Sequence, residues 1–181
     1  VGYLHTNVVK IADQMIDVNL LIDRFELNGI LEVPKNKISI DIGFSDIELN
    51  IEYNCSDAIV MTSVAEGFGL PIIEGQKCGL IPVVTDSSAM SELVENRGEL
   101  VKSSEYYSQM EQAVDIVDND DLFCKMMAVV EMSKNEKEAF LHRKKSNEEF
   151  SKKFDWNNMV ENFIDIVGDI SQSPIVPVET M

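Results

Sequence analysis

Residues Glu66-Gly67-Phe68-Gly69-Leu70-Pro71-Ile72-Ile73-Glu74 lie between two short apolar stretches that have the composition of strands. Pro71 marks a helix start, because proline has a fixed helical φ and lacks only an N–H that the first helical position does not need. Glu74 then falls about one turn inside the helix. Glycines let the backbone approach a ligand closely, and free N–H groups at a helix start attract anions. The segment predicts a phosphate-binding turn with an acidic side chain on each side.

Short apolar strands alternate with helices on both sides of this segment. The expected strands are Gly2–His5, Ile38–Ile42, Ala58–Met61 and Pro82–Thr85. The expected helices are Val9–Leu27, ended by Asn28-Gly29, then Asp46 to about Asn54, opened by a capping box of Ser45 and Glu48, and Leu70–Cys78. This alternation predicts the α/β class, with a doubly wound parallel sheet covered by helices on both faces. Ligands gather beyond the carboxyl ends of such strands, which is where Thr62–Glu66 lies.

The segment resembles the Glu-x7-Glu signature of the retaining glycosyltransferases of family 4, often called group 1. Asn54–Ser63 is similar to the small-Asp-apolar strand ending in Ser that precedes the signature, and Gly75–Asp86 to the helix end, turn and strand that follow it. Ser91–Val94 and Gly98–Val101 match the next short helix and strand. Members have the GT-B fold of two facing Rossmann-like domains. The resemblance implies that this chain is a Rossmann-like donor-binding domain, one half of that fold, with a helical C-terminal extension.

The resemblance also implies a role for each residue of the segment. Glu74 would hold the ribose hydroxyls of the donor, and Glu66, taken as the catalytic residue, would contact the hydroxyls of the transferred sugar. The N–H groups that would meet the sugar and the distal phosphate belong to Gly67, Phe68, Gly69 and Leu70. The loop that would meet the nucleobase is Gly43, Phe44 and Ser45, with Thr85–Ser88 as a second candidate loop on the same edge.

The implied reaction is retaining transfer of a hexose from a nucleoside diphosphate sugar to a hydroxyl of a glycan or glycoconjugate. The resemblance implies no cofactor and no metal. Family members place an Arg and a Lys, near the loop after the first strand, against the diphosphate. This sequence has no matching pair, so we expect that basic loop in an upstream segment and expect this fragment to be inactive without it. Lys77 and Arg97 are the nearest cations to the segment, and neither is assigned.

Other interpretations of the same residues stay open. From spacing by itself, Glu66 could be an exposed loop residue and Glu74 a solvent-facing helix residue, which is the ordinary place of glutamate. His5 is either a border of the base pocket or a structural histidine. The alternative function is a non-catalytic interaction module on a Rossmann scaffold. A dehydrogenase-like dinucleotide binder is disfavoured, because no strand is followed by Gly-x-Gly-x-x-Gly.

We expect residues 1–170 to form the donor domain with its C-terminal helices, residues 171–181 to be a disordered tail, and the N-terminal acceptor domain to be missing. A natural one-domain protein is the alternative. The helices expected after Val101 are Ser108–Val117, Asp120–Met132, Glu136–Phe150 and Asp155–Ile170. The apolar face of the last helix is expected to be partly uncovered, at Met159, Phe163, Ile166 and Val167.

The net charge of −17 repels polyanions, so nucleic acid is not an expected partner. The stretch Lys134–Lys153 holds seven basic residues and predicts a solvated helix face. A membrane-surface role for this stretch is the weaker alternative, because four acidic residues are interspersed. No run of about 18 apolar residues exists to span a membrane, and the expected location is the cytoplasm.

Neither the cysteines nor the one acidic run of the sequence predicts a metal site. Cys55, Cys78 and Cys124 are widely spaced in apolar surroundings, which indicates reduced core residues rather than a disulfide frame or a zinc site. Asp118–Asp121 lacks the spacing of a calcium loop and predicts an acidic helix cap.

Overall fold

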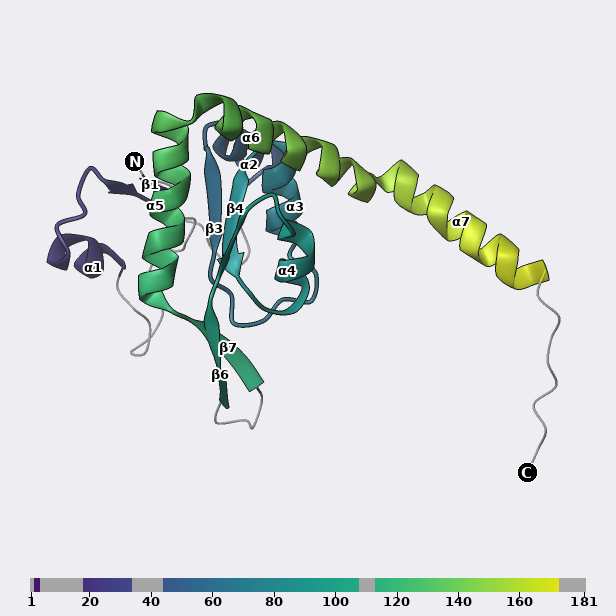
Figure 1. Ribbon diagram of the computed structural model, residues 1–181, viewed down its shortest axis with the longest axis horizontal. Helices are drawn as coiled ribbons and strands as arrows, with labels where there is room; N and C mark the ends of the chain where they lie inside the picture. The colour runs from purple at the N-terminus through teal and green to yellow at the C-terminus, as the bar shows by residue number, and fades with distance from the viewer. Residues whose placement is uncertain (1, 4–17, 34–43, 108–112, 173–181) are drawn as a thin grey trace. The chain divides into compact units, whose positions relative to one another are not determined.

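The computed structural model describes residues 2–3, 18–33, 44–107 and 113–172 of the 181-residue chain (Figure 1). The chain divides into two compact units, Val1–Leu49 and Asn50–Met181. The predicted α/β class is confirmed, with a parallel sheet and flanking helices in the second unit. The strand expected at Ile38–Ile42 and the histidine at position 5 lie outside the described residues.

The first unit contains a small parallel strand pair and a short helix. Strand β1 (Gly2–Tyr3) pairs in parallel with β2 (Leu31–Glu32). Helix α1 (Val18–Arg24) ends earlier than Asn28-Gly29, where the sequence predicted its end. Glu26 adopts a left-handed φ of 55°, and the Leu27 N–H donates to the Ile22 carbonyl at 2.9 Å. A left-handed residue with this hydrogen bond is how a glycine usually ends a helix, and here Glu26 takes that conformation. The helix therefore ends before the glycine at position 29.

Helix α2 (Asp46–Asn54) begins with the predicted capping box and crosses the boundary between the two units. The Ser45 N–H and hydroxyl donate to Glu48 Oε2 at 2.9 and 2.8 Å, and the Glu48 N–H donates to Ser45 Oγ at 3.3 Å. These hydrogen bonds lower the pKa of the Glu48 carboxyl, the backbone bond most strongly. The reciprocal bonds satisfy donors that a helix start leaves free, which explains why the helix begins there.

The second unit is built on strands β3 (Ala58–Met61), β4 (Ile81–Thr85) and β5 (Glu99–Val101), which pair in parallel in that order among the described residues. Helices α3 (Leu70–Lys77) and α4 (Ser88–Val94) connect consecutive strands, as in a Rossmann-like sheet. Every residue of β4 is buried. A continuous apolar run is typical of a parallel strand that is covered on both faces, and the predicted strands at Ala58–Met61 and Pro82–Thr85 are confirmed.

Helices cover both faces of β4. On one face, Val84 packs with residues of α3 and α4 in a cluster that also contains Phe150. On the other face, Ile81 and Val83 pack with residues of α5 (Asn119–Asn135) and with Phe140. Phe140 and Phe150 both belong to α6 (Lys137–Ser151), so this helix contributes to both clusters. The core is therefore completed by a helix that follows the sheet in sequence.

The helix expected at Ser108–Val117 is wrong at residues 113–117, which form a strand, and residues 108–112 lie outside the described residues. Strands β6 (Ser103–Tyr107) and β7 (Ala113–Val117) form an antiparallel pair, with Ser104 opposite Ile116 and Tyr106 opposite Val114. The apolar residues of this stretch also fit a period of two, with Val114 and Ile116 on either side of Asp115. Short apolar runs do not distinguish helix from strand by spacing, and here pairing with β6 decides the outcome.

Helix α7 (Trp156–Gln172) follows a single 3₁₀ turn, η1 (Lys152–Phe154). Its apolar side chains are exposed, with Trp156 79% and Phe163 66% accessible, so the predicted uncovered face is confirmed. The helix includes Ser171 and Gln172, which the sequence assigned to the tail, and the rest of that tail lies outside the described residues. No helix in the described ranges combines the length and apolar character needed to cross a bilayer.

The three cysteines are free thiols, but they are not core residues as the sequence predicted. Cys55 and Cys124 are exposed, and Cys78 is half-buried at the end of α3. Partial burial raises the pKa of the Cys78 thiol. Apolar neighbours in sequence misled the prediction, because Cys55 follows α2 and Cys124 lies on an outward side of α5.

Candidate functional site

The segment Glu66–Glu74 runs from the carboxyl end of the sheet into α3. Residues 62–69 connect β3 to α3, and Met61 lies opposite Val84, near the end of β4. The helix expected at Leu70–Cys78 is confirmed, with Cys78 as its last cap. Pro71 is the second residue of α3 rather than the first, and Gly69 is the residue before the helix. The loop therefore occupies the edge where ligands of open α/β sheets gather.

The two glycines of the segment differ in their surroundings. Gly69 has φ 86°, and a Cβ added there would lie 3.1 Å from Ile72 Cδ1 and 3.3 Å from Leu93 Cδ1. Gly69 is thus required by the left-handed turn and by the packing of the helix start. A Cβ added at Gly67 would meet nothing within 4 Å, and the φ of Gly67 is not left-handed. The fold itself does not need glycine at position 67.

Glu66 is half-buried on this loop, and its main chain is fixed by the next crossover. The Glu66 N–H donates to the Oγ of Ser88 at 3.2 Å, and Ser88 is the first residue of α4. The buried Thr85 hydroxyl donates to the Ser63 carbonyl at 3.0 Å. The loop Thr85–Ser88, which the sequence placed on the same edge, therefore lies beside Glu66.

Glu74 is exposed on α3, as an ordinary surface glutamate would be, but its carboxylate has a hydrogen-bond partner within the chain. The Tyr53 hydroxyl donates to Glu74 Oε2 at 3.0 Å. Partial burial raises the pKa of the Tyr53 phenol, and the hydrogen bond to Glu74 raises it further. The contact holds one carboxylate oxygen of Glu74 in place and leaves the other for a different donor.

Phe68 and Leu70 are exposed, at 41% and 61%. The ring of Phe68 meets Phe154 of η1 edge to face, with 5.7 Å between ring centroids. Phe154 in turn packs against Phe150 of α6 at 5.4 Å. An aromatic row that no local sequence pattern predicts therefore connects the segment to the turn that precedes α7.

The predicted nucleobase loop lies in the first unit. Gly43 is outside the described residues, Phe44 is half-buried and Ser45 is exposed. The backbone and hydroxyl of Ser45 are engaged in the capping box of α2. The contact of this loop with a base stays a prediction.

The unassigned cations both make contacts within the chain. Lys77 forms an ion pair with Asp155 at the start of α7. The Arg97 guanidinium stacks on the Phe150 ring, 3.5 Å from its centroid, and pairs with Glu95 at 2.9 Å. These contacts tie α3 and the α4–β5 turn to the C-terminal helices.

The acidic run at Asp118–Asp121 forms the predicted helix cap. Asp118 Oδ1 accepts from the N–H groups of Asp120 and Asp121 at 2.9 and 3.0 Å. Within the described ranges, no group of three or more His, Cys, Asp or Glu is arranged to hold a metal ion.

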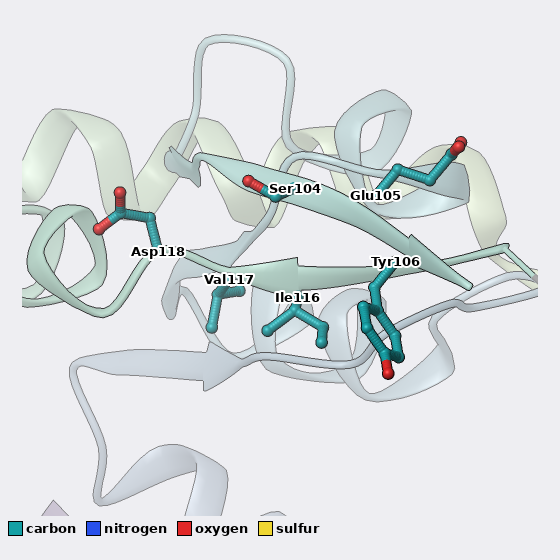
Figure 2. A pocket seen from close by; sticks show the side chains of 6 residues that line it. All are labelled: Ser104, Glu105, Tyr106, Ile116, Val117 and Asp118. Carbon is teal, nitrogen blue, oxygen red and sulfur yellow. The ribbon is translucent and has the colours of Figure 1, made fainter. Parts of the chain in front are cut away.

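A shallow hollow of about 340 Å³ lies on the β6–β7 hairpin (Figure 2). Its lining residues are Ser104, Glu105, Tyr106, Ile116, Val117 and Asp118. Figure 2 shows the side chains of Tyr106 and Ile116 on the same side of the hairpin, where both are exposed, whereas Val117 packs against the core. None of these lining residues belongs to the predicted site, so the hollow and the Glu66–Glu74 segment are separate features.

A comparison with protein families gives a match over the middle of the chain. The family described as glycosyl transferases group 1 matches residues 35–139, which is more than half of the chain and includes the whole segment from Glu66 to Glu74. A search of curated proteins found no match.

Proposed function

The chain belongs to the group 1 glycosyl transferases, and on that premise we propose that it is the donor-binding domain of a retaining hexosyltransferase of family 4. The donor is a nucleoside diphosphate hexose, and the acceptor is a hydroxyl of a glycan or glycoconjugate. The observation that carries the proposal is the Glu66–Glu74 segment, which joins β3 to α3 at the carboxyl edge of a parallel sheet. We propose the cytoplasm as the place of the reaction.

Each residue of the segment has a task in this proposal. Glu74 accepts hydrogen bonds from the ribose hydroxyls through the carboxylate oxygen that Tyr53 leaves free. The N–H groups of Gly67 and its neighbours in the turn meet the sugar and the distal phosphate. The open space around Gly67 supports this assignment, because a ligand can approach the backbone there.

Glu66 contacts the hydroxyls of the transferred hexose and is not a nucleophile. The bond between the anomeric carbon and the phosphate oxygen breaks, and the acceptor oxygen bonds to the same face of that carbon. The acceptor proton passes to the departing phosphate oxygen. In this scheme the protein contributes mainly orientation and electrostatic stabilisation of the leaving group.

Calorimetric titration with uridine and guanosine diphosphates and their hexose conjugates tests the proposal. We expect one base series to bind. Replacing Glu74 by Ala should weaken both the diphosphate and its hexose conjugate by about tenfold or more, because hydrogen bonds to a charged acceptor are lost. Replacing Glu66 by Ala should weaken the hexose conjugate and spare the diphosphate.

The matched control is Glu92→Ala, which removes an exposed glutamate of α4 outside the segment and should leave both affinities unchanged. If the full-length protein binds no nucleoside diphosphate sugar, the proposal is refuted.

The alternative is a non-catalytic interaction module, and the exposed apolar side chains of α7 favour it. A module of this kind would bind a protein partner and be indifferent to every nucleotide in the titration above. The same measurement therefore separates the two functions.

A further inference from the structure

Asp115 of β7 lies where two loops of the carboxyl edge meet the start of β6. The Asp115 N–H donates to the Val64 carbonyl at 3.0 Å, in the loop between β3 and α3. Its carboxylate accepts the Ser87 hydroxyl on Oδ2, from the loop before α4. On Oδ1 it accepts the Ser103 hydroxyl at 3.4 Å, from the start of β6. The half-buried side chain and the amide of Asp115 thus connect two loops and the start of β6.

The contacts of Asp115 enclose Glu66 from two sides. Val64 lies two residues before Glu66, and its carbonyl is held by the Asp115 amide. Ser88, whose Oγ accepts the Glu66 N–H, follows directly after Ser87. Because Ser87 is held by the Asp115 carboxylate, the partner of the Glu66 amide is fixed as well.

The local conformation of α4 agrees with this arrangement. Ser87 occupies the position before the helix, where a serine side chain usually accepts an N–H of the first turn. No such bond is formed. The next residue, Ser88, adopts a left-handed φ of 50°, which is unusual for a serine. The Ser87 hydroxyl donates to Asp115 and accepts no N–H of α4, so the bond that Ser87 makes is to β7 rather than to its own helix.

We propose that Asp115 is a positioning residue that holds the backbone of Glu66 in the geometry needed to bind the sugar of the donor. The proposal rests on the function proposed above, because it assigns Glu66 to the hexose. The Asp115 carboxylate accepts a hydroxyl on each oxygen, whereas an asparagine has one acceptor oxygen and could keep only one of these two bonds in the same direction. Asp115 touches no reacting atom and acts through Glu66.

The test combines Asp115→Asn with Glu66→Gln in a double-mutant cycle on the full chain. The probes are the nucleoside diphosphate that binds the wild type and its hexose conjugate. Asp115→Asn should weaken binding of the conjugate by roughly tenfold and leave binding of the diphosphate unchanged. In the Glu66→Gln background the same change should have less than about a twofold effect, because coupled residues are not additive.

Hydrogen exchange of the Glu66 amide gives a second measurement that does not need a ligand. Asp115→Asn should speed exchange at this amide by about tenfold, because the Ser88 acceptor is no longer held. Asp118→Ala is the control. It removes the cap of α5, just after β7, and lowers stability without touching the loops around Glu66.

The outcomes separate the two proposals. If Asp115→Asn weakens the conjugate equally with and without Glu66, or weakens the diphosphate as much as the conjugate, the positioning role is overturned. Exchange at Glu66 that is no faster in Asp115→Asn than in Asp118→Ala also overturns it. Failure of the wild type to bind any of the probes overturns the proposed function, and with it the role of Asp115 toward a donor.

Discussion

At the scale of single residues, Gly67 and Gly69 show that neighbouring glycines of one motif serve different ends. Gly69 is needed by the backbone, because its φ is 86° and its Cα faces Ile72 and Leu93. Neither the φ of residue 67 nor the space around it requires a glycine at that position. The sequence treats the two alike, since only the folded turn determines which of them faces open space.

Alanine at these two positions should therefore separate folding from binding. Gly69→Ala should lower the unfolding free energy by about 1–3 kcal/mol through strain and crowding. Gly67→Ala should leave stability unchanged or raise it by about 0.5 kcal/mol, yet weaken nucleotide-sugar binding, because its methyl group would occupy ligand space. Urea unfolding and calorimetry measure the two effects. Undiminished binding by Gly67→Ala would contradict a ligand against that backbone.

Tyr53 is the residue at which stability should respond to alkaline pH. Its folded-state pKa is raised above the ordinary value of about 10, because the phenol is partly buried and bonded to Glu74. The contribution of the phenol is therefore complete below about pH 10 and is lost as pH rises further, because only the unfolded chain ionises readily.

Tyr53→Phe removes this contribution. The difference in unfolding free energy between wild type and variant should be about 1 kcal/mol, constant from about pH 7 to 9, and should shrink above about pH 10. Urea titrations of both proteins with reductant at each pH give the difference. A gap that widens above pH 10 is incompatible with the raised pKa.

At the scale of elements, α6 contributes to both core clusters and also forms a buried hydrogen-bond network that no local sequence pattern predicts. Its buried Asn147 accepts from Gln76 Nε2 of α3 at 2.9 Å and donates to the carbonyls of Arg97 and Arg143 at 3.0 and 3.1 Å. Gln76 Nε2 also donates to the Leu93 carbonyl at 3.0 Å. This buried network joins α3, the residues around α4, and α6.

Removing one member of this network should be costly. Asn147→Ala removes the side-chain donor to the Arg97 carbonyl and one of the two acceptors of Gln76 Nε2. It should therefore lower the unfolding free energy by about 2–4 kcal/mol. Lys145→Ala, on an exposed side of the same helix, should change it by no more than about 0.5 kcal/mol. Thermal and urea unfolding compare the two. Equal stabilities would show that packing rather than the network holds α6.

The basic stretch on α6 also differs from the solvated face that the sequence predicted. Arg143 pairs with Glu99 of β5 at 2.7 Å, and Lys144 pairs with Asp57 before β3 at 3.0 Å. Glu99 also pairs with Lys125 of α5 at 3.3 Å. Some of these cations therefore dock helices against the sheet, which a count of charges along the chain does not reveal.

At the scale of the whole molecule, the net charge of −17 is the largest electrostatic contribution to consider. Repulsion among like charges destabilises a compact chain, and salt screens it over a Debye length that falls from about 30 Å at 0.01 M to about 8 Å at 0.15 M. The ion pairs of α6 act in the opposite sense, but they are few, and the Asp57 side of the Lys144–Asp57 pair is exposed, which makes that pair weak.

Stability should therefore rise with salt. Between about 0.01 and 0.15 M sodium chloride we expect the melting temperature to increase, because the repulsion is screened more than the few pairs are weakened. Scanning calorimetry measures it, with sorbitol at equal osmolality as the uncharged control. A melting temperature that falls with salt would mean that local ion pairs outweigh the net charge.

The sequence by itself determined the elements whose signals are local. The capping box began α2, and the continuous apolar strands and Pro71 located β3, α3 and β4, because caps, fixed dihedrals and buried runs act within a few residues. Only the tertiary structure decided that residues 113–117 are a strand, that Asp115 joins two loops and the start of β6 beside Glu66, and that Asn147 bonds to Gln76. Those contacts join residues far apart in the chain, so their energies depend on packing that no local pattern specifies.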